Sequence, residues 1–270
     1  MKTGGITLRP IGYVRSSVTD PKDLPFEGVP AQIEILERWE EALDGIENYS
    51  HIIVLGHLNG AEPRSLKVHP MGISSLPEVG LLASRSPHRP NPITVTVTRL
   101  LRRKSRTLSV DPLDLIDGTP VVDIKPYHPS TDSVFGATTP DRFNLFRFIP
   151  EEELLRHLVI EASRFHGEAC AGLAIGVRIA WRAMKELACD LRSREVEVLS
   201  KAGGCMTDAV QALTGANSKR LRRSDELDGT IAINKGDRKL AFAIGQDRRF
   251  RKVEEVLRAR DEEIFTLHMK

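Results

Sequence analysis

The chain has 270 residues, 40% hydrophobic and 28% charged, with three cysteines and a formal net charge of +2. This composition excludes a disordered or collagen-like chain, and the small net charge indicates no global positive field for nucleic acid. No apolar run approaches the roughly 20 residues that span a bilayer, so we expect no membrane segment. The odd cysteine count and the lack of a secretory signal favour the cytoplasm. At about 150 residues per domain, the length predicts two domains.

The first 150 residues are rich in proline and carry short β-type runs separated by proline, glycine and aspartate. Alternation of apolar residues and threonine over 93–98 predicts a half-buried strand. Residues 107–110 are its expected partner, with a loop at 102–105 between them. One short helix is expected at 37–43. Other strands are expected at 33–36, 51–55 and 119–124. Many short strands with turn signals predict an all-β barrel or a strongly bent sheet.

After Pro150 the pattern changes to that of an α+β domain. Three glutamates after this proline predict a helix start. Apolar residues at spacings of three and four predict one helical stripe made of Leu173, Val177, Ala180, Met184 and Leu187. Further helices are expected at 208–213 and 253–260, and strands at 230–233 and 240–244, joined by a turn at Gly236-Asp237. We expect the two domains to be residues 1–145 and 146–270.

A proline-rich loop from Ser84 to Pro92 is the most unusual string in the first domain. Its three prolines within six residues restrict φ and exclude a helix, so we expect a stiff, extended loop. Arginine forks on such a loop suit bidentate capture of a carboxylate or a phosphate. A connection with solvated arginines is the alternative. The candidate binding residues are Arg85, Ser86, His88, Arg89 and Asn91.

A second string, DGTPVVDIKPY, covers residues 117–127 and is followed by Asp132. Its Asp-Gly pair predicts a turn. Asp123 and Lys125 alternate with apolar residues, so they share one strand face, where they form either a surface ion pair or part of a site. The candidate residues of this string are Asp117, Gly118, Thr119, Asp123, Lys125 and Tyr127.

These two strings, with Pro10–Ser16 and Leu43–His51, resemble the TsaA/TrmO family over roughly residues 7–140. The resemblance implies a single-sheeted β-barrel and a homodimer. It also implies S-adenosylmethionine-dependent methyl transfer to N6 of threonylcarbamoyladenosine at position 37 of tRNA, with the two strings, Lys125 included, binding the cofactor. The family usually has glycine where this chain has Thr94, which implies an altered pocket. The tRNA-binding C-terminal region of the bacterial enzymes has no recognisable counterpart.

The implied reaction needs a group that accepts a proton. N6 of a carbamoylated adenine is a poor nucleophile because its lone pair is delocalised, so a positioned base should assist it. The candidates for this base are Asp123, Asp132, Tyr127 and His88, and the sequence does not rank them. Two other functions are also open: methyl transfer to a different substrate in one-carbon metabolism, and a non-catalytic module that binds S-adenosylmethionine or a metal.

The second domain contains a candidate metal site. Cys170 and Cys205 lie at predicted helix N-termini, where the helix dipole lowers a thiol pKa. His166 precedes Cys170 by four residues, so we expect that both can reach one ion, zinc being the candidate. Alternatively, the cysteines are small buried hydrophobic residues, as we expect for Cys189.

The strings His166–Arg178 and Cys205–Gly215 resemble the FmdE family, named for a formylmethanofuran dehydrogenase subunit, over roughly residues 163–250. The resemblance implies the α+β fold. Relatives tend to have histidine where Glu168 stands and often have cysteine at the position of Ala216. Two basic clusters, at 99–106 and 219–223, are either solvated loops or surfaces that contact phosphate.

Overall fold

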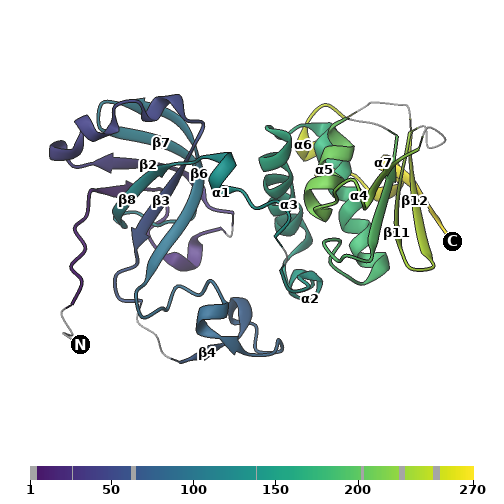
Figure 1. The fold of residues 1–270 in the computed structure, drawn as a ribbon, viewed down its shortest axis with the longest axis horizontal. Helices are drawn as coiled ribbons and strands as arrows, with labels where there is room; N and C mark the ends of the chain where they lie inside the picture. The colour runs from purple at the N-terminus through teal and green to yellow at the C-terminus, as the bar shows by residue number, and fades with distance from the viewer. Residues whose placement is uncertain are drawn as a thin grey trace. The chain divides into compact units, whose positions relative to one another are not determined.

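The computed structural model describes residues 5–25, 27–61, 65–137, 139–201, 204–224, 229–245 and 250–270. The chain divides into two compact units, Met1–Ser133 and Val134–Lys270 (Figure 1). The expected boundary after residue 145 lies inside the second unit. Phe135 stacks on Phe165 there, with ring centroids 5.3 Å apart. Among the described residues, no helix is both long and apolar enough to cross a membrane.

The first unit is a closed barrel of six strands in the order β1-β2-β7-β6-β3-β8, and neighbouring strands are antiparallel. The predicted single-sheeted barrel is therefore confirmed. Its strands are β1 Gly12–Arg15, β2 Val29–Ile35, β3 His51–His57, β6 Ile93–Lys104, β7 Thr107–Leu113 and β8 Pro120–Pro126. The remaining elements are β4 Lys67–Val68, β5 Val79–Gly80, α1 Pro129–Asp132, and the 3₁₀ helices η1 Pro21–Asp23, η2 Glu37–Trp39, η3 Glu41–Leu43, η4 Ile46–Asn48, η5 Pro70–Gly72 and η6 Leu81–Ala83.

Strand β6 turns its threonines toward the barrel interior. Thr98 pairs with buried Ile52 and Thr96 with buried Val54, and Thr98 itself is 1% exposed. Val95 points to the opposite side of the strand and is 47% exposed. The predicted alternation is present, but the interior beside β6 is lined by threonine, which leaves apolar side chains on the outside of the barrel.

Two predictions about local structure are wrong. The expected helix at 37–43 is replaced by η2 and η3, two short 3₁₀ turns. The guanidinium of Arg103 holds this segment by donating to the carbonyl of Leu43 at 3.0 Å and to the carboxylate of Asp44 at 2.9 Å. The expected loop at 102–105 is mostly strand, because β6 continues to Lys104 and the hairpin turns at residues 105–106.

The second unit is α+β, as predicted. Its sheet has the order β10-β9-β11-β12-β13, in which only β9 and β10 are parallel. Figure 1 shows α3, α4 and α5 on one side of this sheet. The elements are α2 Phe143–Phe146, α3 Glu151–His166, α4 Ala171–Leu187, β9 Val196–Ser200, α5 Cys205–Thr214, β10 Leu221–Arg223, β11 Thr230–Lys235, β12 Arg238–Ile244, α6 Val253–Arg258, α7 Asp261–Ile264 and β13 Phe265–Met269.

Helix α4 is the centre of the second core. All five residues of the predicted stripe are buried. Gly176 lets α5 approach closely, since a Cβ at this position would lie 2.4 Å from the carbonyl oxygen of Met206. This close approach places the N-terminus of α5 beside α4. The predicted turn between β11 and β12 is also confirmed, with Gly236 at φ +57°.

A partly buried ion cluster ties the start of the second unit to its core. Arg142 Nε lies 2.7 Å from Asp190 Oδ2, and Arg142 Nη1 lies 3.1 Å from Glu161 Oε2. Burial alone would raise the pKa of Asp190, but the hydrogen bond and positive charge of Arg142 lower it below its ordinary value. The stabilisation is therefore present above the unfolded-state pKa and is lost as the pH falls through the lowered pKa.

We expect Arg142→Met to lower the free energy of unfolding of the second unit by about 3 kcal/mol, because it leaves a buried carboxylate without its partner. Hydrogen exchange of the α4 amides at neutral pH measures this loss. Arg156→Met is the control: its ion pair with Glu152 is exposed and should contribute less than about 1 kcal/mol. The Arg142 effect should shrink on acidification. Equal losses in the two variants would contradict the role of the buried cluster.

Candidate functional site

The proline-rich loop and the Asp-Gly turn adjoin the same end of the barrel. In the sheet register, His57 pairs with Ile93, and Gly56 pairs with Val121. The loop leads into β6 and the turn leads into β8, so both lie beside the C-terminal end of β3. The structure therefore brings to one end of the barrel the candidate residues Arg85, Ser86, His88, Arg89, Asn91, Asp117, Gly118 and Thr119.

Gly56 is the point at which the three segments meet. Its amide donates a hydrogen bond of 3.0 Å to the Thr94 hydroxyl. A Cβ at this glycine would lie 2.8 Å from Thr94 Oγ1, 3.2 Å from Leu115 Cδ1 and 3.4 Å from Thr119 Cγ2. Thr94, which replaces the family's usual glycine, thus faces a glycine on the neighbouring strand. There is room for a side chain at only one of these two positions. Sequence reasoning did not single out Gly56, since its only signal is a glycine within a strand.

The two arginines of the loop have different roles. Arg89 Nη1 donates to the carbonyl of Ser84 at 2.7 Å and to that of Leu81 at 3.4 Å, so this guanidinium holds its own loop. Arg85 Nη2 donates to the carbonyl of Val95 in β6 at 2.8 Å, and the residue is exposed. Arg85 therefore has the guanidinium that is better placed to receive a ligand.

The same loop contains a buried polar atom without a partner. His88 Nδ1 is buried and has no hydrogen-bond partner among the described residues. Ser86 is half-buried, its amide donating to the Ser84 hydroxyl, whereas Asn91 is exposed. An unsatisfied buried nitrogen costs free energy unless something pairs with it. No protein group of the described residues uses this nitrogen, so it is available to hydrogen-bond a bound molecule.

The predicted turn is confirmed, with Gly118 at φ +74°. Asp117 Oδ1 accepts a 3.0 Å hydrogen bond from the amide of Ser16, just after β1, and the Gly118 amide donates to the carbonyl of Val14. Thr119 Oγ1 donates to the carbonyl of Ile116 at 2.7 Å. The Asp117 carboxylate thus anchors the turn to the first strand.

Lys125, Tyr127 and Asp132 lie away from this end. Lys125 Nζ is 2.7 Å from Asp123 Oδ2, which confirms that the two share a strand face, and the hydrogen bond raises the pKa of Lys125. The amide of Tyr127 donates to the carbonyl of His51, at the opposite end of β3. His51 and Gly56 are five residues apart on β3, which is about 17 Å of strand. Asp132 accepts a hydrogen bond from the His128 amide and lies beyond that far end.

Strand β8 also contains an irregularity that the sequence did not reveal. Leu55 pairs with Asp123 and the next residue, Gly56, pairs with Val121, so β8 has one extra residue at this point. A bulge re-aims the side chains beside it and is common next to active sites. Asp123 lies at this bulge, between the two ends of the barrel.

The second unit contains a compact group of possible metal ligands. One ligand atom each from His166, Cys170 and Cys205 lie within 4.8 Å of one another. The three residues come from three helix ends: His166 ends α3, Cys170 caps α4, and Cys205 begins α5. The prediction that both cysteines lie at helix N-termini is therefore confirmed. Glu168 is exposed and is not part of the group.

Asp208 completes this group and was missed from the sequence. His166 Nδ1 lies 2.8 Å from Asp208 Oδ2, and His166 Nε2 lies 3.8 Å from Cys170 Sγ. A carboxylate on one imidazole nitrogen orients the other nitrogen toward a metal. The spacing of three residues from Cys205, on one face of α5, is the signal that sequence reasoning could have used.

The pKa expected for Cys205 is wrong. Burial raises the pKa of its thiol, and the neighbouring Cys170 raises it further, although the residue lies at a helix N-terminus. Desolvation and a second thiol outweigh the dipole here. Cys189 is buried at 2% exposure, as expected for a core residue.

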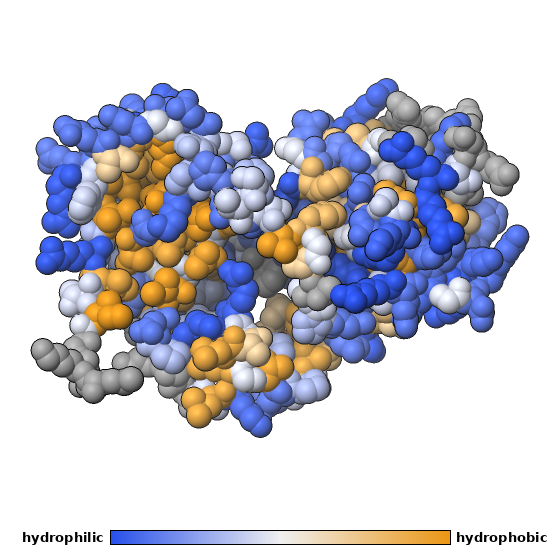
Figure 2. Space-filling view, viewed as in Figure 1, coloured by the Kyte–Doolittle hydropathy of each residue, from blue (hydrophilic) through white to orange (hydrophobic). Residues whose placement is uncertain are grey.

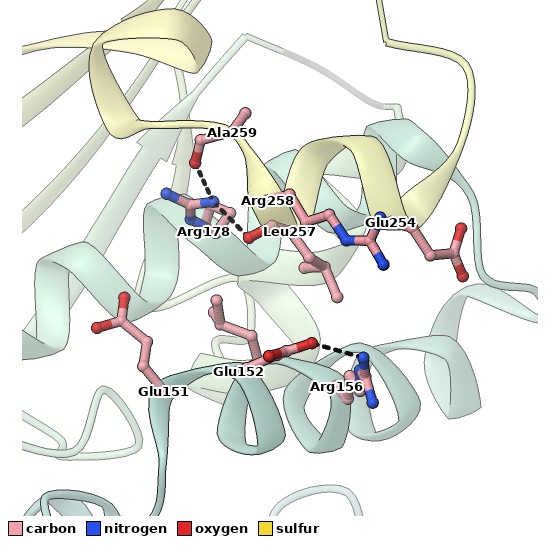
Figure 3. Close-up of a pocket in the computed structure, with 9 residues that line it drawn as sticks. Glu151, Glu152, Arg156, Arg178, Glu254, Leu257, Arg258 and Ala259 are labelled. Carbon is pink, nitrogen blue, oxygen red and sulfur yellow. Dashed lines mark hydrogen bonds and ion pairs between the residues drawn. The ribbon is translucent and has the colours of Figure 1, made fainter.

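A groove of about 360 Å³ lies elsewhere in the second unit, between α3, α4 and α6 (Figure 3). Its charged side chains are largely paired: Arg156 lies 2.6 Å from Glu152, and Arg178 donates to carbonyls at the end of α6. None of the candidate site residues lines it. The groove residues are Glu151, Glu152, Leu155, Arg156, Arg178, Glu254, Leu257, Arg258 and Ala259.

Comparison with known proteins identifies both units. Residues 13–133 match the family model of the tRNA-methyltransferase O N-terminal domain. An S-adenosyl-L-methionine-binding protein of Archaeoglobus fulgidus is 40% identical over 131 residues, which are 47% of this chain and 93% of that protein. The chain belongs to the tRNA-methyltransferase O family. Residues 165–247 match a second model, FmdE, Molybdenum formylmethanofuran dehydrogenase operon. Both resemblances predicted from the sequence are confirmed.

Two further relatives differ in how much of the chain they match. A "Probable S-adenosyl-L-methionine-binding protein" of Archaeoglobus fulgidus is 37% identical over 219 residues, 78% of this chain, so the match extends into both units. The chain spans 58% of that protein's length. The human tRNA (adenine(37)-N6)-methyltransferase is 31% identical over 144 residues, 49% of this chain and 32% of that protein.

Gly56→Ala should destabilise the barrel unit by about 1–3 kcal/mol, since its methyl group would overlap the Thr94 hydroxyl. Adding Thr94→Gly should recover much of this loss, and a double-mutant cycle on urea unfolding measures the coupling. Gly80→Ala is the control, because a Cβ there meets no atom within 4 Å and φ is −58°. Additive effects of the two substitutions would contradict the shared space.

Proposed function

We propose that this chain is an S-adenosylmethionine-dependent methyltransferase that acts on N6 of adenosine 37 in tRNA, with threonylcarbamoyladenosine as the substrate nucleoside. Membership of the tRNA-methyltransferase O family and the names of the relatives support this proposal. The observation that carries it is the meeting of the proline-rich loop and the Asp-Gly turn at one end of the barrel, beside a buried histidine nitrogen without a partner.

The residues at this end suit the cofactor chemically. S-adenosylmethionine has a carboxylate, an adenosine and a methyl group on a sulfonium, and when bound it supplies that electrophilic methyl group. The exposed Arg85 would pair with the carboxylate, and the turn at 117–119 would offer polar backbone groups to the adenosine. His88 Nδ1 would gain the hydrogen-bond partner that it lacks. Arg89 acts on the loop itself, holding it in the conformation that presents these groups.

The proton on N6 has to pass to an acceptor as the new bond forms. Asp123 lies at the bulge of β8, between the cofactor loop and the far end of the barrel, and it also binds Lys125. Tyr127 and Asp132 lie at the far end, about 17 Å from Gly56 along the strand. His88 lies in the proposed cofactor loop itself. Of the other three candidates, Asp123 is therefore the one closest to that loop along the chain.

A homodimer would change this geometry. The outer surfaces of β3 and β6 carry the partly or fully exposed apolar residues Ile53, Leu55, Val95, Val97 and Leu101. Figure 2 shows hydrophobic side chains gathered on the near side of the barrel unit. In a dimer with a two-fold axis, the same patch of each copy contacts the other, and the two patches run in opposite directions. Such a dimer would bring Tyr127 and Asp132 of one copy toward the loop of the other, so we include it in the proposal.

Arg85→Ala should weaken S-adenosylmethionine binding by about tenfold or more, since a charge-assisted hydrogen bond contributes about 1.5–3 kcal/mol. Calorimetry measures the affinity, and transfer of a radiolabelled methyl group into total tRNA, followed by nucleoside analysis, measures the reaction. Arg38→Ala removes an exposed arginine of η2, outside the proline-rich loop, the Asp-Gly turn and the basic clusters, and should change neither.

Each outcome of this experiment selects a function. Labelled methyl groups on threonylcarbamoyladenosine support the full proposal. Methyl transfer to tRNA that lacks this modification, or to a small molecule only, would show that threonylcarbamoyladenosine is not the substrate. Tight cofactor binding without transfer to any acceptor would favour the non-catalytic module.

We also propose that His166, Cys170 and Cys205 bind zinc in the second unit. Two thiols and an imidazole form a soft ligand set, and the Asp208 carboxylate behind the imidazole supports it. Three protein ligands would leave a fourth position for water or another ligand.

Elemental analysis of untagged protein should find about one zinc ion per chain, and Cys205→Ser should lose it. Asp208→Asn should weaken zinc binding by about 10–100-fold, because it removes the carboxylate that orients His166. Cys189→Ala is the control, since this cysteine is outside the group and should leave the zinc content unchanged. Zinc retained by the Cys205 variant would rule out this site.

A further inference from the structure

A cluster of six cations lies where α5 ends and the edge strand β10 begins. Because β10 runs parallel to β9, residues just before β9 lie beside residues just before β10, and Leu221 pairs with Val198. This arrangement brings together two stretches that are 25 residues apart in the sequence. We call the cluster the β10 cationic surface; it comprises Arg192, Arg194, Lys219, Arg220, Arg222 and Arg223.

Arg220 is the structural centre of this surface. Its guanidinium donates hydrogen bonds to the carbonyls of Ser193 at 3.2 Å, Val196 at 3.3 Å, Thr214 at 3.0 Å and Gly215 at 2.9 Å. Two of these carbonyls end α5, where the helix dipole favours a cation. No carboxylate pairs with Arg220 among the described residues. The loop before β9 is thus tied to the loop before β10 by a guanidinium that bonds to carbonyls and is not neutralised by a carboxylate of the described residues.

The positive charges of this surface are crowded and only partly neutralised. Burial lowers the pKa of Arg220, and the charges of Arg192 and Arg194 lower it further. Arg192 reaches Glu161 at 3.3 Å, but that carboxylate also binds Arg142. Mutual repulsion of this kind is relieved when an anion binds among the cations.

The outer members of the surface are open to solvent. Arg194, Lys219 and Arg223 are exposed, and none has an ion-pair partner within the ranges that the structure describes. Arg222 is also exposed and lies 3.3 Å from Glu197, a pair at the surface that water screens. Since successive strand residues point to opposite faces, Arg222 and Arg223 present charge on both faces of the edge strand.

We propose that the β10 cationic surface binds the phosphodiester backbone of RNA and so holds the tRNA substrate by the second unit. The inference rests on the proposed function for its choice of RNA. The exposed cations follow a loop and a strand, and none of them lines the groove between α3, α4 and α6. Several separate cations on an open surface suit a chain of phosphates better than one small anion.

The test removes the exposed cations and leaves Arg220 in place, since it ties the two loops together. In the triple variant Arg194→Ala, Lys219→Ala, Arg223→Ala, the slope of log affinity for tRNA against log salt should fall by about 2–3, because each lost phosphate contact contributes about 0.7–0.9. Fluorescence anisotropy over a potassium chloride series measures this slope. Binding of S-adenosylmethionine, measured by calorimetry, should be unchanged.

A matched triple variant controls for net charge. Arg164→Ala, Arg251→Ala, Arg258→Ala removes three exposed cations from other parts of the same unit and should leave the slope within about 0.5 of the wild-type value. Equal losses in both triple variants, an unchanged slope in the first, or preferred binding of anionic lipid vesicles over tRNA would overturn the proposal. Selective loss of tRNA binding supports this surface even if no methyl transfer is found. If the first triple variant binds tRNA and transfers methyl groups normally, this surface is rejected and the proposed function stands.

Discussion

The position of β3 between β6 and β8 is the constraint on which the barrel unit depends. Both neighbours are antiparallel to β3, so the segments that lead into them approach the same end of the barrel. The proline-rich loop and the Asp-Gly turn are about 30 residues apart in the sequence, and hydrogen bonds of the sheet alone bring them together. The same pairing sends Tyr127 to the opposite end, because it follows β8 instead of preceding it.

The sheet also explains why the outside of the barrel is apolar. Thr98 and Thr96 of β6 pair with the buried Ile52 and Val54 of β3, so the threonines face the interior. Because side chains alternate along a strand, Val95 and Val97 face outward. Together with the outward Ile53 and Leu55 of β3, these valines form an apolar patch over two paired strands, which is the surface that a second copy would cover in the proposed dimer. One choice of register thus determines both the lining of the barrel and the character of its outer face.

In the second unit, helix ends carry the polar chemistry. His166, Cys170 and Cys205 meet because α3, α4 and α5 pack closely, with Gly176 allowing the contact between α4 and α5. At the other end of α5, the free carbonyls hold Arg220 and reach Arg192. A helix presents amide groups at its start and carbonyl groups at its end. One helix therefore adjoins the thiol and imidazole group at its start and the cationic surface at its end.

The sequence by itself determined the two fold classes, most of the long elements and the strings of polar residues that carry the candidate sites. Those features depend on local periodicity, on proline and on turn chemistry, which act over a few residues. Only the tertiary structure decided which polar groups meet: Gly56 against Thr94, His166 against Asp208, and Arg220 beside Arg194. It also decided the inward threonines of β6 and the raised pKa of Cys205. These features depend on register, on close packing and on desolvation, which arise between segments far apart in the chain.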